Sequence, residues 1–198
     1  MRPMDSHTHY YWDDPQYAVS QLDRYQYSHL TILGLPGDLL SNIQAMMAKN
    51  ARPEQVFTFG CLMYAEGLQP TPESHKAQLQ MLMDAGFDGW KIIETKPTTY
   101  TAVGRIPLDS DIFEPAFALA EEKQFPITWH CGDPATFWDE EACLDWAKEN
   151  GWFGASGYTC EFARMPYAAF LPILQDEDFQ FVTEEELPEG YRPGELYF

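Results

Sequence analysis

Short apolar runs alternate with amphipathic segments along the first two thirds of the chain. The apolar runs predict strands, and the segments between them carry apolar positions at helical spacing. The predicted strands cover 3–9, 29–33, 56–63, 89–93 and 126–130, and the predicted helices cover 15–25, 39–50, 71–84 and 110–123. Strands that begin about 25 to 38 residues apart, each followed by a helix, indicate βαβ units and a parallel sheet.

Local signals support this assignment. Asp14-Pro15 provides an N-cap and a first-turn proline, and Gly86 suits a helix C-terminus. In the helix at 39–50, Leu39, Ile43 and Met46 or Met47 share one face, so we expect that face to pack on the sheet. No G-x-G-x-x-G or P-loop follows any strand, which favours an α/β fold of the (β/α) TIM-barrel type over a nucleotide-binding sheet.

The regularity weakens after residue 130. We expect a loop at 131–137, helices at 138–150 and 167–175, and a sixth strand near 179–182. Residues 183–198 are rich in glutamate, contain two prolines and lack a helical stripe, which predicts a disordered acidic tail. The expected organisation is therefore one incomplete barrel domain of five to six βα units over 1–182, followed by a tail over 183–198.

Charge and composition narrow the function. The chain has 198 residues and a formal net charge of −19, from 31 acidic and 12 basic residues. Such a charge argues against nucleic acid or an anionic membrane as partner, because both are polyanions. No stretch of 18 apolar residues and no apolar signal-peptide core is present, so we expect a cytoplasmic protein that acts on a small molecule.

The four cysteines show no C-x-x-C spacing, so neither a disulfide framework nor a cysteine-rich zinc site is expected. Cys131 directly follows His130 and has two interpretations, a nucleophile or a buried structural thiol. On a strand it faces away from its neighbour, which favours the structural thiol.

Histidines at strand ends carry the candidate chemistry. His7 and His9 are two residues apart on the first predicted strand, so their imidazoles point to the same side. Neutral imidazole is a common metal ligand, so the pair predicts half of a divalent-metal site; a surface or processing-scar His-x-His is the alternative. His130 closes the fifth strand, and active sites of parallel barrels lie at that end. His75, in a helical first turn, is expected to be solvated.

Three motifs in order resemble the amidohydrolase superfamily, in its amidohydrolase-related branch of metal-dependent hydrolases and decarboxylases. They are Asp5-Ser6-His7-Thr8-His9, the stretch 86–92 that contains Lys91, and the stretch 126–132 that contains His130. The resemblance covers about residues 4 to 175. It implies that His7, His9 and His130 bind a divalent metal, most often zinc, which activates water against a C–N or ester bond or assists a non-oxidative decarboxylation. Lys91 matches the bridging position of the family loosely, and a metal ligand, a contact to a substrate carboxylate and an interior salt bridge stay open for it.

The chain departs from the family pattern at the metal-binding aspartate and the later histidine. Family members carry an Asp after the eighth strand and often a His after the sixth, whereas no histidine follows His130 here. The barrel is short by roughly two βα units. A truncated product, completion of the sheet by a second copy in a homo-oligomer, and a replacement carboxylate near 133–140 are the three explanations, in that order.

The replacement carboxylates are Asp133, Asp139 and Glu140, although Asp139 and Glu140 also suit the start of a helix. Trp138, with other aromatic residues that follow the first and fifth strands, is a candidate for an apolar substrate pocket, with ordinary packing as the alternative. Two functions follow: a metal-dependent hydrolase, or a catalytically inactive metal-binding remnant or partner subunit.

Overall fold

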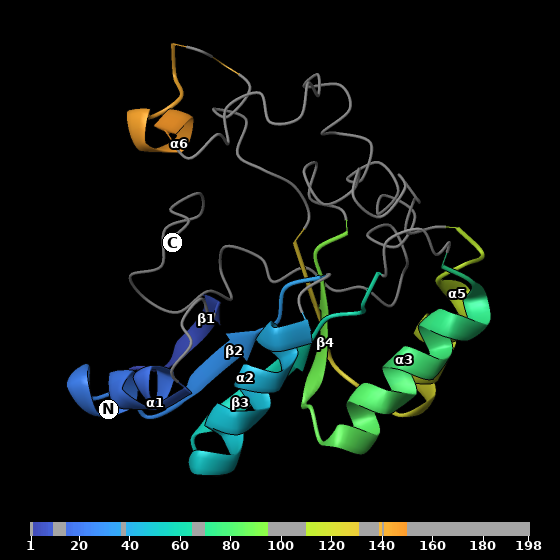
Figure 1. Ribbon diagram of the computed structural model, residues 1–198, viewed down its shortest axis with the longest axis horizontal. Coiled ribbons are helices and arrows are strands. Elements are labelled where there is room, and N and C mark those ends of the chain that lie inside the picture. Colours follow the sequence, from blue (N-terminus) through green and yellow to red (C-terminus); the bar gives the residue numbers. More distant parts are fainter. Residues whose placement is uncertain are drawn as a thin grey trace, which may run out of the picture.

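The computed structural model describes residues 2–9, 15–36, 39–64, 70–94, 110–130, 139 and 141–149 (Figure 1). All structural statements below apply to these residues. Several sequence-based predictions lie outside them: the sixth strand at 179–182, the helix at 167–175, the tail at 183–198, and the roles of Cys131, Asp133, Trp138 and Glu140.

Five parallel strands form the sheet, and their order in space equals their order in the chain. They are β1 (Asp5–His9), β2 (Leu30–Leu33), β3 (Val56–Gly60), β4 (Gly89–Ile92) and β5 (Ile127–Trp129). Each strand pairs in parallel with the one before it, with helices between them. The sheet curls into a half-barrel (Figure 1), which confirms the expected α/β, incomplete TIM-barrel-like fold.

Among the described residues, five helices flank the sheet or follow it: α1 (Pro15–Arg24), α2 (Leu39–Ala51), α3 (Pro72–Ala85), α5 (Glu114–Glu122) and α6 (Asp145–Glu149). Thr71 and Ser74 form a reciprocal capping box at the start of α3, and Gly86 ends the helix in the left-handed region at φ 88°. The predicted cap at Gly86 is therefore confirmed. The predicted start of α5 at Ser110 is early, because that helix begins at Glu114. None of the described helices is long and apolar enough to cross a membrane.

Helix α2 presents the opposite face from the one predicted. Leu39, Ile43 and Met47 are about half exposed, whereas the buried residues are Ser41, Asn42, Gln44, Ala45 and Ala48. The prediction that the Leu39 face packs on the sheet is wrong. The polar face of α2 turns inward because the backbone groups that follow β2 and β3 need hydrogen-bond partners, and side chains of α2 supply them.

Those partners are specific side chains. Ser41 Oγ accepts a hydrogen bond from Leu35 N at 3.1 Å. Asn42 bonds both backbone groups of Cys61, accepting from N at 3.0 Å and donating to O at 2.8 Å. Buried backbone groups are costly when unpaired, so these bonds outweigh the apolar stripe in orienting the helix.

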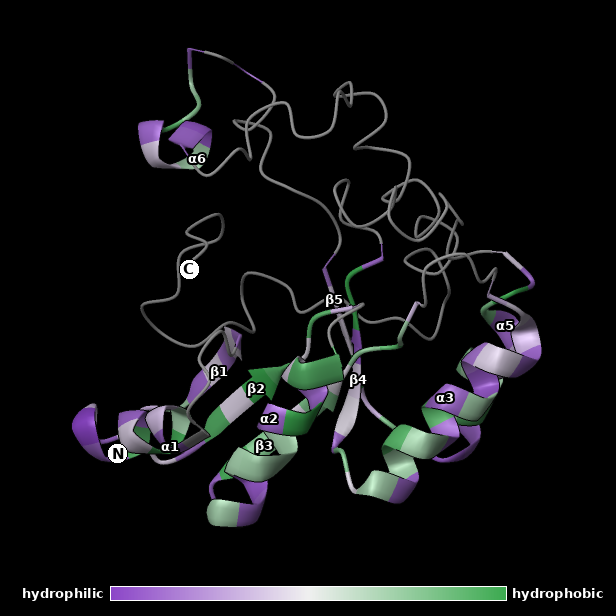
Figure 2. Cartoon of the chain, viewed as in Figure 1, coloured by the Kyte–Doolittle hydropathy of each residue, from purple (hydrophilic) through white to green (hydrophobic). Residues whose placement is uncertain are grey.

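The apolar core lies between the sheet and the helices. Strand β2 is buried along its whole length and is strongly hydrophobic (Figure 2). Trp90 of β4 lies 5.3 Å from Phe117 of α5, measured between ring centroids, and is fully buried. Because side chains alternate along a strand, Lys91 lies on the opposite sheet face from Trp90. The same core therefore fixes which side of β4 faces the barrel interior.

Candidate metal centre

The imidazoles of His7 and His9 meet at the end of β1. Their Nε2 atoms are 3.3 Å apart, and their rings are edge to face with centroids 5.2 Å apart. The expectation that both rings point to the same side is therefore met. His7 N also donates to Asp5 Oδ1 at 3.1 Å, which holds the backbone of the motif in place.

A backbone carbonyl orients His9. Its Nδ1 lies 2.9 Å from Leu33 O at the end of β2. A carbonyl only accepts, so Nδ1 carries the proton in the neutral ring and Nε2 carries the lone pair. Metal-binding histidines in proteins are commonly held this way, with the second ring nitrogen donating to a carbonyl or carboxylate.

The spacing of the pair suits a tetrahedral metal. Two nitrogens bound to zinc at about 2.0–2.1 Å and separated by the tetrahedral angle are about 3.3–3.4 Å apart. The observed Nε2–Nε2 distance of 3.3 Å agrees with that separation. The two histidines therefore fit as two ligands of one divalent ion.

Electrostatics favour the neutral form that a metal ligand requires. Burial, followed by the charges of Lys91 and His130, lowers the pKa of His7, and Asp5 acts in the opposite direction. Burial lowers the pKa of His9 to about 4, opposed by the Leu33 carbonyl and assisted by Lys91, His7 and His130. Both rings are thus predominantly neutral at pH 7.

Lys91 and His130 lie close enough to act on the pair electrostatically. Lys91 is fully buried on β4. His130 follows β5, and its backbone N donates to Ile92 O at 2.9 Å, which extends the pairing of β4 with β5. Within the described ranges, no three His, Cys, Asp or Glu side chains form a group that could hold a metal. The structure thus brings His7 and His9 together and leaves His130 nearby, without closing a three-residue site.

Asp139 has a structural use in the fold. Its Oδ1 accepts from Glu141 N at 2.9 Å and Ala142 N at 3.2 Å. These bonds hold the turn at 141–142, and helix α6 begins only at Asp145, so the helix predicted over 138–150 starts later than expected and Asp139 serves a turn and not a helix start.

A buried polar chain at the end of β4 was not anticipated. The Tyr64 hydroxyl oxygen lies 2.8 Å from Glu94 Oε1 and 3.3 Å from His75 Nε2, and His75 Nδ1 lies 3.2 Å from Ile112 O. His75 is fully buried and stacks on Phe113 with centroids 4.6 Å apart, so the prediction of a solvated His75 is wrong.

A signal for the burial of His75 was present in the sequence. The buried residues of α3 are His75, Leu79 and Leu82, at helical spacings of four and three. His75 therefore belongs to the apolar stripe of its helix. Its polar atoms are satisfied by the Ile112 carbonyl and Tyr64, which makes the burial tolerable.

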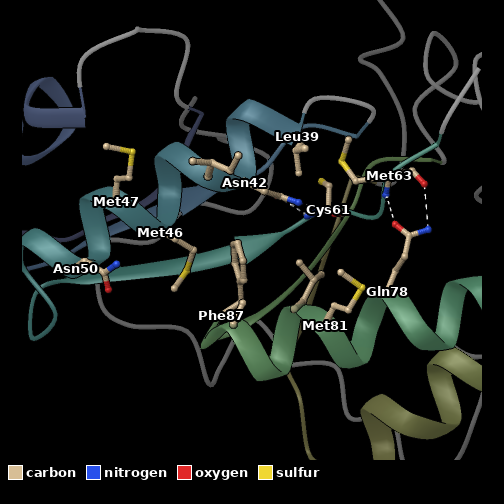
Figure 3. Close-up of a pocket in the computed structure, with 13 residues that line it drawn as sticks. Leu39, Asn42, Met46, Met47, Asn50, Cys61, Met63, Gln78, Met81 and Phe87 are labelled. Atoms are coloured by element: carbon tan, nitrogen blue, oxygen red, sulfur yellow. Dashed lines mark hydrogen bonds between the residues drawn. The ribbon is translucent and has the colours of Figure 1, made fainter.

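A separate pocket of about 380 Å³ lies between α2 and α3 (Figure 3). It is largely apolar, with Ile43, Met47 and Met81 among its lining residues, and Asn42 and Gln78 hydrogen-bonded at its inner edge. The thirteen described lining residues include none of the strand-end histidines and no charged side chain. This pocket is therefore distinct from the histidine pair.

Comparison with known proteins bears on the fold. No family model and no curated protein matches the chain. Among solved structures, the chain is similar to crystalline 4-oxalomesaconate hydratase from Rhodopseudomonas palustris, with a TM-score of 0.50 and 13% sequence identity. The match covers 88% of this chain and 70% of the hydratase chain. At this identity the likeness shows the fold alone, a barrel-like arrangement of parallel strands and helices.

Proposed function

We propose that the chain is a metal-dependent enzyme of the amidohydrolase type. The observation that carries this proposal is the His7–His9 pair, with Nε2 atoms 3.3 Å apart and His9 Nδ1 anchored on Leu33 O. His7 and His9 would supply two ligands of a zinc-type ion, and His130 a third. The fold likeness to a hydratase supports a reaction in which water is the co-reactant.

The bound ion would supply activated water and polarise a substrate carbonyl. The chain's own residues would hold and orient the reactants. Leu33 O fixes the tautomer of His9, and the low pKa values of both histidines keep their lone pairs available. Lys91, buried on the face opposite Trp90, would bind a carboxylate of the substrate, because an ammonium in a poorly solvated site attracts anions strongly.

The proposed reaction is hydrolysis of a C–N or ester bond in a small carboxylate-bearing molecule, or the related non-oxidative decarboxylation. Lys91 lies at this end of the sheet, close enough to act on both histidines, in a chain of net charge −19. A basic side chain at this position favours an anionic substrate over a neutral one.

Metal analysis tests the proposal. We expect the purified chain, loaded with zinc and desalted, to retain one ion, and the His7→Ala and His9→Ala variants to lose it. His29→Ala is the matched control, because His29 precedes β2 at the other end of the sheet and packs on Phe57. Cobalt substitution then reports the ligand geometry through its visible spectrum. A chain that retains no metal, or that retains it equally in His7→Ala, would refute the proposed metal centre.

Turnover is tested separately on the zinc-loaded chain with a panel of carboxylate-bearing amides and esters. Zinc binding without turnover on any of them would favour the second candidate, a metal-binding chain without catalysis. The observation that favours it is that the Asp139 carboxylate, a candidate replacement acid, is engaged by the backbone N–H groups of Glu141 and Ala142.

A further inference from the structure

Glu94, Tyr64 and His75 form a buried chain of hydrogen bonds that joins the end of β4 to α3. Glu94 and His75 are fully buried, and Tyr64 is partly buried between them. Glu94 Oε2 also accepts from Ile93 N at 2.7 Å. The three groups come from separate segments of the chain, so their contacts depend on the whole fold at this point.

With Glu94 ionised and His75 neutral, these three side chains hold one proton too few to make both hydrogen bonds of the Tyr64 oxygen. Ile112 O can only accept, so His75 Nδ1 carries a proton. If Glu94 is ionised and His75 is neutral, the single hydroxyl proton of Tyr64 serves either the 2.8 Å contact or the 3.3 Å contact, but not both. The other contact then sets two lone pairs against each other in a buried site, which is unfavourable.

One added proton satisfies both contacts in either of two ways. In the first, the Glu94 carboxylic acid donates to Tyr64, which donates to His75 Nε2. In the second, the His75 imidazolium donates to Tyr64, which donates to the Glu94 carboxylate. The two forms interconvert when the Glu94 O–H bond breaks, its proton passes to the Tyr64 oxygen, and the Tyr64 proton passes to His75 Nε2.

The surroundings favour the first form. It places no charge in the buried site, whereas the second separates two opposite charges across a tyrosine. Burial raises the pKa of Glu94, opposed by its hydrogen bonds and Lys91, and burial lowers the pKa of His75, opposed by the Ile112 carbonyl. Among the described neighbours, Cys61 stays a neutral thiol because burial raises its pKa well above the usual range.

We propose that Glu94, Tyr64 and His75 form a proton relay that holds one proton on Glu94 at neutral pH. Lys91 then faces a neutral acid in place of a carboxylate, so Glu94 does not compete with an anionic substrate for the Lys91 side chain. This second step rests on the proposed function, because it leaves the Lys91 ammonium to bind an anionic substrate.

Spectroscopy of the metal-free full-length chain tests the relay without any substrate. At pH 7 we expect an infrared C=O stretch of a neutral carboxylic acid that is lost in Glu94→Gln. Glu122→Gln, at a solvent-exposed position on α5, is the matched control and should retain it. Nitrogen-15 NMR should show His75 as the neutral Nδ1–H tautomer. Tyr64→Phe should shift the His75 Nε2 resonance and provides a second readout if Glu94→Gln does not fold.

The absence of the acid band, an imidazolium at His75, or the Nε2–H tautomer would overturn the relay. The charge of Lys91 is read from its carbon-13 resonances, with acetate as the probe anion. We expect an ammonium at pH 7 whose signals shift on addition of acetate in the wild type and in Glu94→Gln. If the Lys91 carbon-13 signals do not shift with acetate, the proposal that Lys91 binds a carboxylate-bearing substrate is wrong. The proton relay is judged separately, by the infrared band of the neutral Glu94 acid.

Discussion

Replacing Asn42 by leucine tests how α2 is attached to the sheet. Leucine has the same branched arrangement of heavy atoms, so the substitution removes the two bonds to Cys61 without opening a large cavity. Two net hydrogen bonds contribute about 1 kcal/mol each, and leaving the buried N–H and C=O of Cys61 without partners adds to the loss. We expect the free energy of unfolding to fall by about 2–5 kcal/mol, a large part of the 5–15 kcal/mol typical of a domain.

Urea unfolding followed by tryptophan fluorescence measures this change as a lower midpoint at an unchanged slope. Asn50→Leu is the control on the same helix, because Asn50 is exposed and its replacement should change stability by less than about 0.5 kcal/mol. If Asn42→Leu is as stable as the Asn50 control, the two bonds do not orient α2.

Two further predictions concern pH and packing. His9 has a pKa of about 4 in the folded chain against 6.5 in the unfolded chain, so between these pH values the unfolded chain binds more protons. The free energy of unfolding should therefore fall, by up to about 3 kcal/mol, as the pH drops from 6.5 to 4. Urea midpoints between pH 7 and pH 4.5 should show this slope, reduced in His9→Asn; equal slopes in both proteins would contradict it. Gly89→Ala should lower the free energy of unfolding by about 1–3 kcal/mol, seen as a lower thermal midpoint, because its Cβ would overlap the edge of the Phe59 ring at Cε1 and lie 2.7 Å from Pro126 O. Gly86→Ala, where the Cβ would make only an ordinary contact with Met46 Cε at 3.8 Å but φ is positive, is expected to cost about 1 kcal/mol, and a larger loss there than in Gly89→Ala would refute the packing argument.

The repeating features of the fold were predictable from the sequence. Five strands at regular spacing with helices between them are a local pattern repeated along the chain, and the parallel sheet follows from it. Gly86 was predictable because a helix end needs a residue that tolerates positive φ. The orientation of His7 and His9 was predictable because it depends only on the two-residue period of a strand.

The errors arose where tertiary polar contacts override an apolar pattern. Helix α2 has an apolar stripe, yet Ser41 and Asn42 face inward because the backbone beyond β2 and β3 requires partners. His75 was assigned to solvent from its position in the first turn of a helix, whereas Ile112 O and Tyr64 satisfy it in the interior. Backbone carbonyls look alike in a sequence, so such partners are visible only once the fold is known.

The same limit applies to the candidate metal centre. The sequence identified His7 and His9, but their anchoring on Leu33 O involves a carbonyl of the neighbouring strand. The relay likewise joins Glu94, Tyr64 and His75 from three segments with no common motif. Long-range placement of ordinary polar residues was therefore the part that sequence reasoning missed.

The sequential strand order has a consequence for assembly. Each strand pairs with its predecessor in the chain, so the sheet can grow one strand at a time during synthesis, without waiting for distant segments. His130 follows His9 by 121 residues, so a metal ion would have only two of its proposed ligands until β5 docks. Strand β5 is three residues long and only partly buried, and it lies at the end of the described sheet. A metal ion bound by His7, His9 and His130 would therefore stabilise the docking of β5 on the described sheet. The backbone amides of β5 should then exchange with solvent more slowly in the zinc-loaded chain than in the metal-free one.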